Sequence, residues 1–311
     1  MAIEKQTKQF ASSNGKDQVV YDIYLPERPA KGVLQVSHGM CEWFGRYEAF
    51  ARFLAEQGFI VCGNDHLGHG RTAKSNADLG YFAPAQGWRY LVQDLAKLTD
   101  LLQPSYPDLP YFLLGHSMGS FLARAYLTEY GQRLSGTIIM GTSGKNPLAG
   151  LGILLLKLLK LAKGERHRSQ FLQSIAFYDY NKRFQPQKSE HDWLSRDIDL
   201  VAQYEKEPWC NFIFTLSGFD DLFHMLQWVS RVEWSKEVPV DLPILLVSGE
   251  DDPVGNYGKG VLEVYQKLLQ AGCTKVQQKL YPAARHELLN ESNREEVYQD
   301  LLHWLELLCR S

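Results

Sequence analysis

Short apolar runs of strand length alternate with amphipathic segments of helix length along most of the chain. Several runs are rich in β-branched residues, which favours buried strands. The segments between them carry apolar residues three or four positions apart, which is typical of helices that cover a sheet. This alternation predicts an α/β fold with a mostly parallel sheet. The expected strands lie near 7–12, 19–25, 32–37, 59–65, 111–114, 136–141, 244–248 and 275–281, and the expected helices near 47–57, 87–103, 121–127 and 295–309.

One junction between an expected strand and an expected helix carries a serine flanked by glycines. The sequence Gly-His-Ser-Met-Gly occupies 115–119, between the strand at 111–114 and the helix at 121–127. A turn this sharp strains the serine backbone, and the two glycines let the strand and the helix close around it. It would project the hydroxyl of Ser117 out of the sheet. Three fixed positions recur by chance, so the strand–turn–helix context makes Ser117 the candidate nucleophile.

A serine hydroxyl needs a base and an orienting carboxylate to act as a nucleophile at neutral pH. An acidic cluster at 250–252 directly follows the expected strand 244–248, at the edge where ligands bind in parallel α/β folds. His286 follows the last expected strand. The order serine, acid, histidine is that of an α/β-hydrolase triad.

Three neighbouring acids compete for the pairing with His286. Asp252 stands directly before Pro253, and a proline pushes the preceding residue into an extended conformation. We expect Asp252 to be the partner and the other two to be solvated loop charges. Asp251 or Glu250 takes this place if the turn is shifted by one residue.

Two backbone donors are expected to stabilise a developing oxyanion. The N–H of Met118 directly follows the serine, and the N–H of Met40 lies on the loop after the third expected strand. Gly39 would let this loop approach Ser117 closely. The two methionine side chains would line the pocket, where a flexible thioether suits apolar substrates.

Two histidine-containing features have a structural interpretation. Asp65, His66 and His69 bring potential metal ligands together, but glycines mark the segment as a loop and no further ligand has metal-site spacing. We therefore expect no metal ion. His116 is expected to point away from the active site into the packing around the turn, because a base adjacent to Ser117 in sequence cannot easily meet an outward-facing hydroxyl. Gly39 and His116 are the residues expected to border the substrate pocket.

Five motifs occur in a fixed order along the chain. They are His38-Gly39-Met40-Cys41-Glu42 with Arg46-Tyr47, Asp65-His66-Leu67-Gly68-His69-Gly70, Gly115-His116-Ser117-Met118-Gly119, Gly249-Glu250-Asp251-Asp252-Pro253, and Arg285-His286-Glu287-Leu288-Leu289-Asn290-Glu291. In this order they resemble the α/β-hydrolases of the monoacylglycerol lipase and lysophospholipase family, which is grouped with the serine-aminopeptidase-like hydrolases. The resemblance covers roughly residues 10–143 and 238–308 and is weak between them.

This resemblance implies an α/β-hydrolase fold with a mostly parallel eight-stranded sheet. It implies Ser117, Asp252 and His286 as the triad, and Met40 and Met118 as the oxyanion donors. The implied activity is hydrolysis of lipid-like carboxylic esters, monoacylglycerol or lysophospholipid, without a cofactor.

The alternation of strands and helices stops in the middle of the chain. We expect a first part of the core at 1–143, an inserted and mainly helical cap at 144–237, and a second part of the core at 238–311. A cap over the serine would exclude water and select the acyl or alcohol group. The leucine-rich run at 151–161 is too short and too rich in lysine to span a bilayer. It is either a core-facing cap helix or a surface that makes transient contact with a membrane.

Composition limits the choice of partners. The chain has 311 residues, 45% of them hydrophobic, and a net charge of −3, which gives no electrostatic argument for binding nucleic acid or an anionic membrane surface. We expect no nucleic acid partner, and the resemblance implies a small-molecule acyl ester as the substrate. Five scattered cysteines indicate reduced thiols. No apolar run follows the polar start, so we expect no signal peptide and a cytoplasmic protein, peripheral to a membrane if the cap binds one. The sequence carries no signal for an oligomeric state.

Other functions remain open for the same fold. Short-chain carboxylesterases, serine aminopeptidases and carbon–carbon bond hydrolases use the same triad. Epoxide and haloalkane hydrolases resemble the chain less, because they carry an aspartate where Ser117 stands. A non-catalytic binding protein of this fold usually lacks part of the triad or the oxyanion hole, and neither is incomplete in this sequence.

Overall fold

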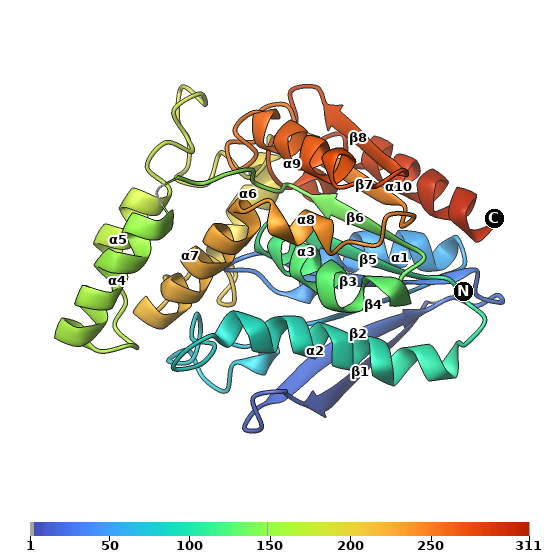
Figure 1. Cartoon of the computed structure of the whole chain (residues 1–311), viewed down its shortest axis with the longest axis horizontal. Coiled ribbons are helices and arrows are strands. Elements are labelled where there is room, and N and C mark those ends of the chain that lie inside the picture. Colours follow the sequence, from blue (N-terminus) through green and yellow to red (C-terminus); the bar gives the residue numbers. More distant parts are fainter. Residues whose placement is uncertain (1–2, 148, 311) are drawn as a thin grey trace.

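An eight-stranded sheet forms the centre of the protein (Figure 1). The computed structural model describes residues 3–147 and 149–310. The strands are β1 (Glu4–Ala11), β2 (Gln18–Leu25), β3 (Gly32–Ser37), β4 (Phe59–Asn64), β5 (Tyr111–His116), β6 (Gly136–Met140), β7 (Ile244–Gly249) and β8 (Val276–Tyr281). Their order is β1-β2-β4-β3-β5-β6-β7-β8, with β2 antiparallel to both neighbours and every pair from β4 to β8 parallel. The predicted fold class is confirmed.

Helices cover both faces of the sheet and the edge where the parallel strands end. They are α1 (Glu48–Glu56), α2 (Gly87–Leu102), α3 (Met118–Tyr130), α4 (Ala149–Lys163), α5 (Gln170–Ala176), α6 (Ile198–Lys206), α7 (Leu216–Ser230), α8 (Glu233–Lys236), α9 (Lys259–Gln270) and α10 (Arg294–Cys309). Short 3-10 turns lie at Phe44–Tyr47, Gly70–Thr72, Gln103–Ser105, Gly131–Arg133 and Leu288–Asn290. The helical insertion expected between two sheet strands is present as α4–α7, called the insert below; it lies beyond the carboxyl edge of the sheet (Figure 1).

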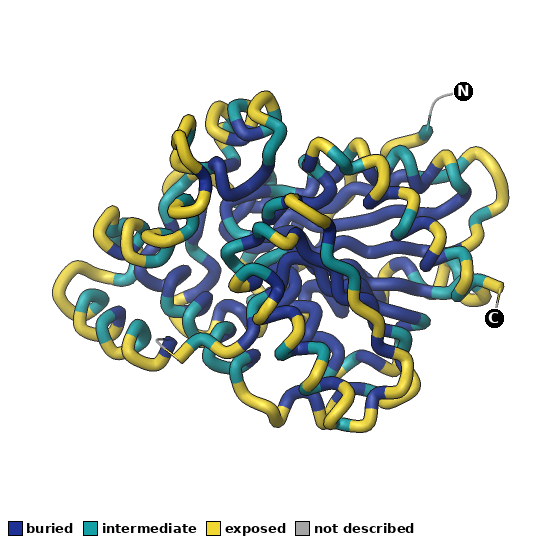
Figure 2. The backbone as a smooth tube through the Cα atoms, turned by 90° about the horizontal axis from the view of Figure 1, so that it is seen from above, coloured by how far each residue is buried: buried dark blue, intermediate teal, exposed yellow. Residues whose placement is uncertain are grey.

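Side chains of the central strands alternate between two hydrophobic layers. Val33 and Ile60 belong to the layer under α2, α3 and α9, whereas Leu34 and Val61 belong to the layer under α1 and α10. Because successive strand residues point to opposite faces, a sheet covered on both sides reads as a continuous apolar run. Strands β3, β4, β5, β6 and β7 are buried along their whole length, and the exposed backbone lies mainly in the edge strands, the outer helices and the loops (Figure 2).

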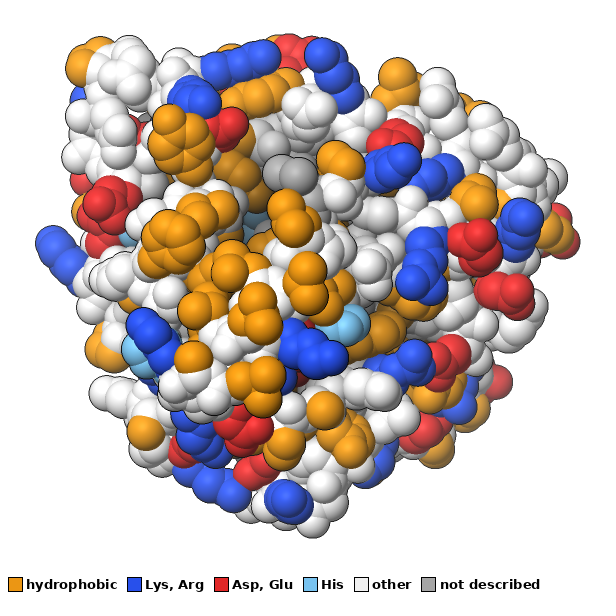
Figure 3. Space-filling model, turned by 60° about the vertical axis from the view of Figure 1, so that its left-hand side comes forward, with side chains coloured by type: hydrophobic (Ala, Val, Ile, Leu, Met, Phe, Trp, Pro, Cys, Tyr) orange, Lys and Arg blue, Asp and Glu red, His pale blue; other side chains and the backbone are white. Residues whose placement is uncertain are grey.

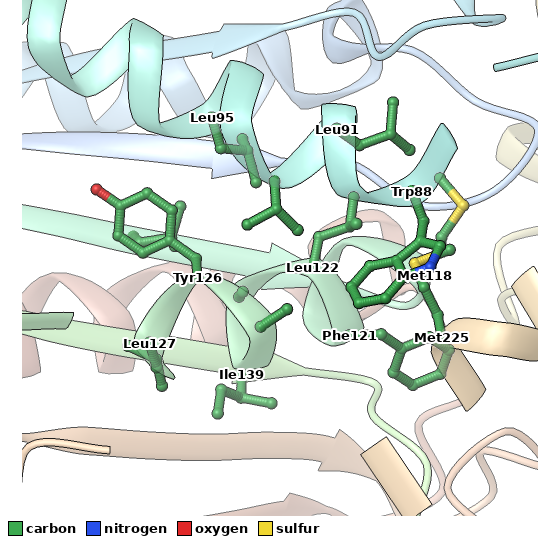
Figure 4. Close-up of a cluster of buried hydrophobic side chains, with 14 of the residues drawn as sticks. Trp88, Leu91, Leu95, Met118, Phe121, Leu122, Tyr126, Leu127, Ile139 and Met225 are labelled. Carbon is green, nitrogen blue, oxygen red and sulfur yellow. The ribbon is translucent and has the colours of Figure 1, made fainter. Parts of the chain in front are cut away.

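The layer between α2 and α3 extends to the turn that carries Ser117 (Figure 4). Leu91 and Leu95 of α2 lie near Leu122 of α3, and Met118 lies near Trp88. All these side chains are at most 7% exposed. The start of α3 is therefore held by packing on its side facing α2.

Several predicted boundaries differ from the structure; for example, the helix expected at 121–127 extends over Met118–Tyr130 as α3. β1 begins at Glu4 rather than near residue 7, because it is an edge strand that pairs with β2 along its length while most of its side chains are exposed. The first residues of β1 are polar and mostly exposed, so no apolar run in the sequence predicted this part of the strand. The helix expected at 47–57 begins as the 3-10 turn Phe44–Tyr47 and continues as α1.

Helix α4 is apolar on both sides. Leu156 is fully buried on the side facing α7, whereas Leu151, Leu154, Leu158 and Leu161 are 57–80% exposed. Hydrophobic side chains gather on this face of the molecule (Figure 3). The buried side of α4 therefore fits the interpretation as a core-facing cap helix, and its exposed side fits the interpretation as a surface that contacts a membrane. Among the described residues, no helix combines the length and the apolarity that a bilayer crossing requires.

Three histidines, His38, His66 and His69, are fully buried near the carboxyl ends of β3 and β4. The ring centroids of His38 and His66 are 4.1 Å apart, and the backbone N–H of His66 donates to His38 Nε2 at 2.9 Å. Asp65 accepts instead from Arg71 Nε at 2.8 Å. Within 3–147 and 149–310, no three His, Cys, Asp or Glu side chains are grouped as metal ligands. The cluster therefore fixes the loops after β3 and β4.

We expect these histidines to make folding sensitive to acid. Burial lowers the pKa of all three, that of His69 to about 3, against an ordinary value of 6.5. Below pH 6.5 the unfolded chain binds protons that the folded chain excludes, so the free energy of unfolding decreases as pH falls, by about 1.4 kcal/mol per pH unit for each such histidine. Urea unfolding between pH 5.5 and 7.5 measures this slope.

The variant His69→Gln isolates one of these groups. It should unfold with a shallower pH dependence than the wild type, whereas His303→Gln, at an exposed position on α10, should keep the wild-type slope. Equal slopes in all three proteins would show that His69 is not held neutral by the fold.

Candidate active site

Ser117 lies on a strained turn between β5 and α3. Its backbone angles are φ 54° and ψ −121°, a conformation that side-chain-bearing residues rarely adopt. The two flanking glycines make the turn possible. A Cβ on Gly115 would lie 2.3 Å from the carbonyl oxygen of Gly119, and a Cβ on Gly119 would lie 2.0 Å from that of Ser37. Helix α3 therefore begins in direct contact with the end of β3.

Because α3 begins against the end of β3, the loop that follows β3 lies beside Ser117. A Cβ on Gly39 would be 3.0 Å from the Cβ of Ser117, and the N–H of Gly39 donates to Glu42 Oε1 at 2.5 Å. Met118 is the first residue of α3, where backbone N–H groups lack partners within the helix. The structure thus brings Met40 and Met118, the two residues expected to supply oxyanion donors, to the same cavity as Ser117.

His286 is paired with Asp252 beneath that cavity. His286 Nδ1 and Asp252 Oδ1 are 3.0 Å apart, and Asp252 also accepts from Ser248 Oγ at 2.9 Å and from the Val254 N–H at 2.9 Å. Burial alone would raise the pKa of Asp252, but His286 and these donors together lower it below its ordinary value. The carboxylate is therefore charged at neutral pH and fixes which nitrogen of His286 carries the proton.

The geometry distinguishes among the three neighbouring acids. Asp252 is fully buried against His286, whereas Glu250 is exposed and Asp251 is half-buried. A Cβ on Gly249 would lie 2.0 Å from the carbonyl oxygen of Ala284. The end of β7 thus approaches the loop after β8 closely enough for this pairing.

The other nitrogen of His286 belongs to a side chain that lines the cavity. Among the described residues, His286 Nε2 is a buried polar atom without a hydrogen-bond partner. Such an atom is costly to bury unless a group that enters the site uses it. Trp193 of the insert packs on the imidazole, with ring centroids 5.1 Å apart.

Glu42 is the centre of a buried charge cluster behind Ser117 and His286. Its Oε1 accepts from Tyr47 Oη at 2.8 Å and lies 3.2 Å from His116 Nδ1. His116 Nε2 in turn lies 3.3 Å from the carbonyl oxygen of His286. Burial alone would lower the pKa of His116, but Glu42, Glu287 and this carbonyl raise it above its ordinary value.

Arg46 closes this cluster. It donates to Glu42 Oε2 at 3.1 Å and to both carboxylate oxygens of Glu287, at 2.5 and 2.7 Å. Two acids are balanced by one guanidinium and one imidazole, so the cluster tolerates burial through mutual pairing. Glu287 follows His286 directly in the chain. The bidentate pair therefore fixes the loop that carries His286.

The insert is attached to the same loop. Backbone N–H groups of His286 and Glu287 donate to the carbonyl oxygens of Trp193 at 3.3 Å and Leu194 at 2.8 Å. Arg285 donates to the carbonyl oxygen of Ser195 at 3.1 Å. The histidine is thus held from the core side by the charge cluster and from the other side by the insert.

These parts enclose a cavity of about 620 Å³, a volume typical of small-molecule sites. The predicted site residues that line it are Gly39, Met40, His116, Ser117, Met118 and His286. His116 was expected to point away from the active site, but it lines the cavity while its Nδ1 contacts Glu42 and Tyr47. Asp252 supports the site from behind His286.

Sequence reasoning missed the charge cluster as a functional unit. Glu42, Arg46, Tyr47 and Glu287 lie in the motifs that carry the family resemblance, but no role followed from their positions. It also missed Arg124, a fully buried arginine on α3. A charge within the otherwise apolar helical run at 121–127 was the signal for it.

Comparisons with known proteins agree with this geometry. A family model described as serine aminopeptidase, S33, matches residues 28–293. A solved structure of a highly thermostable carboxyl esterase from Bacillus coagulans, in complex with glycerol, superposes with a TM-score of 0.91 at 35% identity and covers 99% of this chain and 100% of that one.

Two curated relatives are similar over most of their length. The monoacylglycerol lipase of Mycolicibacterium smegmatis is 25% identical over 299 residues, which are 95% of each chain. The monoglyceride lipase of Homo sapiens is 28% identical over 288 residues, which are 91% of this chain and 84% of that one.

The family match extends from the segment before β3 to the end of the loop after β8. It therefore includes the strained serine turn, the paired histidine and carboxylate, and the whole insert between them. The chain belongs to the serine aminopeptidase S33 family of α/β-hydrolases.

Proposed function

We propose that this chain is a serine esterase that cleaves carboxylic esters of lipid-like substrates, monoacylglycerols or lysophospholipids, through an acyl-enzyme on Ser117. One observation carries the proposal. In the His286–Asp252 pair, Nε2 of His286 has no hydrogen-bond partner among the described residues, and His286 lines the same cavity as Ser117. This is the arrangement that a general base needs in order to accept a serine proton.

In the proposed first step, Ser117 Oγ attacks the ester carbonyl carbon while His286 takes the hydroxyl proton. The carbonyl oxygen becomes an oxyanion, which the N–H groups of Met40 and Met118 stabilise. The tetrahedral intermediate then expels the alcohol, and His286 returns the proton to the leaving oxygen. In the second step water attacks the acyl-enzyme along the same route and releases the carboxylic acid.

We further propose that residues 144–237 form a cap between core segments 1–143 and 238–311, and that this cap selects the substrate. Apolar side chains from α3, α5 and α7 line the cavity, among them Phe121, Ile175, Leu222 and Leu226. Ile175 is also 55% exposed, so the cavity lining continues onto an apolar outer surface. A fatty acyl chain fits such a lining better than a polar acyl group does.

An aminopeptidase-type reaction is the second candidate, because the family includes such enzymes by name. Binding a substrate ammonium group needs a carboxylate whose charge is free. Glu42 and Glu287 border the cavity, but both are already paired with Arg46, and Glu42 also with His116. Glu190 of the insert also borders the cavity, is exposed and forms no ion pair among the described residues, so an aminopeptidase would have to bind the ammonium group there. A short-chain carboxylesterase remains the alternative within the esterases.

The first prediction from the proposed function concerns Ser117. Ser117→Ala removes the nucleophile, so hydrolysis of p-nitrophenyl esters from acetate to palmitate should fall at least 10³-fold, while the circular dichroism spectrum stays that of the wild type. Ser105→Ala, at an exposed position in a 3-10 turn, is the control and should retain full activity.

The same ester series measures the acyl-chain preference. Wild-type turnover that peaks at medium or long chains supports a lipase-like enzyme, and turnover confined to acetate supports the short-chain alternative. Residual hydrolysis near the wild-type rate in Ser117→Ala would exclude the mechanism.

The second prediction concerns Asp252. Asp252→Asn keeps the shape but removes the charge that orients His286, so kcat should fall roughly 10³- to 10⁴-fold with little change in KM. Asp251→Asn is the control, one residue away and half-buried, and should stay within about twofold of the wild type. A large loss of kcat in Asp251→Asn together with a small loss in Asp252→Asn would show that Asp251, and not Asp252, orients His286.

We also propose that the exposed leucines of α4 bind a lipid surface from which substrate enters the cavity. Leu151, Leu154, Leu158 and Leu161 recur at helical spacing on the outer side of α4. The exposed Lys157 lies on the same helix. Apolar side chains next to cationic ones are typical of helices that lie in the interface of an anionic membrane.

The third prediction tests this contact. The double variant Leu154→Ser/Leu161→Ser should bind mixed phosphatidylcholine–phosphatidylglycerol vesicles at least about tenfold more weakly in a co-sedimentation assay, because two leucines lose their apolar burial. Its hydrolysis of soluble p-nitrophenyl acetate serves as the folding check. Leu307→Ser, which replaces a leucine 51% exposed on α10, should bind as the wild type does. Equal binding of all three proteins would place the membrane contact elsewhere.

A further inference from the structure

Arg124 connects both ends of the proposed cap to the helix that follows Ser117. Its guanidinium is fully buried. Nη1 donates to the carbonyl oxygen of Ser143 at 2.9 Å, where the chain enters the cap, and Nη2 donates to that of Val229 at 2.6 Å, near the end of α7. Trp234 of α8 stacks on the guanidinium at 4.2 Å and also donates to the Val229 carbonyl oxygen at 3.1 Å. One side chain of α3 thus binds the chain where it enters the cap and the end of α7, the last long helix of the cap; we call these two segments the cap junction (residues 142–146 and 229–234).

Stability alone does not account for a charge at this position. Burial lowers the pKa of Arg124 to about 9, and the distant carboxylate of Glu263 offsets only part of this effect. Within the described chain the hydrogen bonds of this guanidinium go to carbonyl and hydroxyl oxygens, and Nε has no partner. An apolar side chain of similar volume would avoid this desolvation cost. The guanidinium supplies instead two directed bonds from a single rigid group.

A chain of hydroxyl groups links Arg124 to the backbone of Ser117. Arg124 Nη1 lies 3.4 Å from Thr142 Oγ1, which lies 2.9 Å from Ser120 Oγ, and Ser120 Oγ lies 2.6 Å from the carbonyl oxygen of Ser117. The carbonyl can only accept, so the Ser120 hydroxyl donates to it. Thr142 must then donate to Ser120 and accept from Arg124. The direction of every bond in this chain follows from the donor at one end and the acceptor at the other.

The cap junction borders the apolar part of the cavity. Ser143 and Asn146 line the cavity on the chain that enters the cap, and Leu222 and Leu226 line it from α7. The N–H of Asn146 donates to Ser230 Oγ at 2.9 Å, so the entering and the leaving chain also touch directly. The separation of these two chains therefore sets the width of the cavity on this side.

We propose that Arg124 is a positioning residue that fixes the cap junction relative to Ser117 and thereby selects substrates with long acyl chains. This inference rests on the proposed esterase function and names the determinant of its acyl-chain preference. Arg124 acts without touching the substrate. It holds the two walls between which the acyl chain lies.

Arg124→Met tests the inference, because methionine keeps an apolar stem and loses every donor. We expect the ratio of kcat/KM for p-nitrophenyl decanoate to that for p-nitrophenyl acetate to fall about tenfold, mainly through a higher KM for decanoate. Arg133→Met is the matched control. Arg133 follows α3, its side chain is 36% exposed, and it pairs with Asp100 at 2.6 Å, so this variant should keep the wild-type ratio. A ratio within twofold of the wild type in folded Arg124→Met would overturn the proposal.

Hydrogen exchange provides a readout that does not depend on activity. Amides in 143–147 and 229–234 should exchange at least tenfold faster in Arg124→Met than in the wild type or in Arg133→Met, and unchanged exchange there would equally overturn the proposal. If Arg124→Met does not fold, Arg124→Lys replaces it in both measurements with the same criteria, because lysine keeps the charge but cannot make both bonds. A wild-type protein without Ser117-dependent ester turnover would overturn the proposed function, while the exchange measurement would still decide whether Arg124 holds the junction.

Discussion

The backbone conformation of Ser117 is the constraint on which the rest of the site depends. A residue with φ 54° and ψ −121° costs on the order of 1–3 kcal/mol, and such strain persists only where the surroundings enforce it. Here the contact of Gly119 with the carbonyl oxygen of Ser37 and the packing of α3 on α2 enforce it. The same contact brings the loop at 38–40 to the first turn of α3. The strain at Ser117, the position of this proposed nucleophile and the positions of the expected oxyanion donors are therefore consequences of one close approach between α3 and β3.

The buried charge cluster extends this constraint to the histidine. One carboxylate, that of Glu42, accepts from the N–H of Gly39 and contacts His116, which reaches the carbonyl oxygen of His286. The loop that approaches Ser117 and the loop that carries the histidine are thus tied to the same group. Burying two acids is costly, but Arg46 and His116 offset their charge within hydrogen-bond distance. A rigid support of this kind is what a site needs when its geometry must hold within about half an ångström.

Much of the fold could be predicted because local sequence pattern and tertiary structure agree in the core. Buried parallel strands read as apolar runs, and Ser117 and Asp252 each follow the end of such a strand, whereas His286 follows the half-exposed edge strand β8. Parallel strands bring these ends to one edge, so the sequence places the residues together without any contact being known. The pairing of Arg46 with Glu287 could not be predicted in this way, since 241 positions separate them. Edge strand β1 was located only in part because its exposed side chains carry no apolar signal.

In the insert, the sequence pattern does not determine which side of each helix packs on the core. Helix α4 is apolar on two sides, so its periodicity leaves open which side packs on α7, and only docking on the core resolves this. The points at which the insert joins the core are more specific. Arg124 breaks the apolar pattern of α3 at a position where any apolar residue would satisfy local rules, and its bonds reach both segments of the cap junction. A charged residue at a buried position of an apolar helix departs from the local sequence pattern. When its hydrogen bonds reach other parts of the fold, the departure indicates a requirement of the tertiary structure. We infer that this requirement is a fixed distance between α3 and the wall of the cavity.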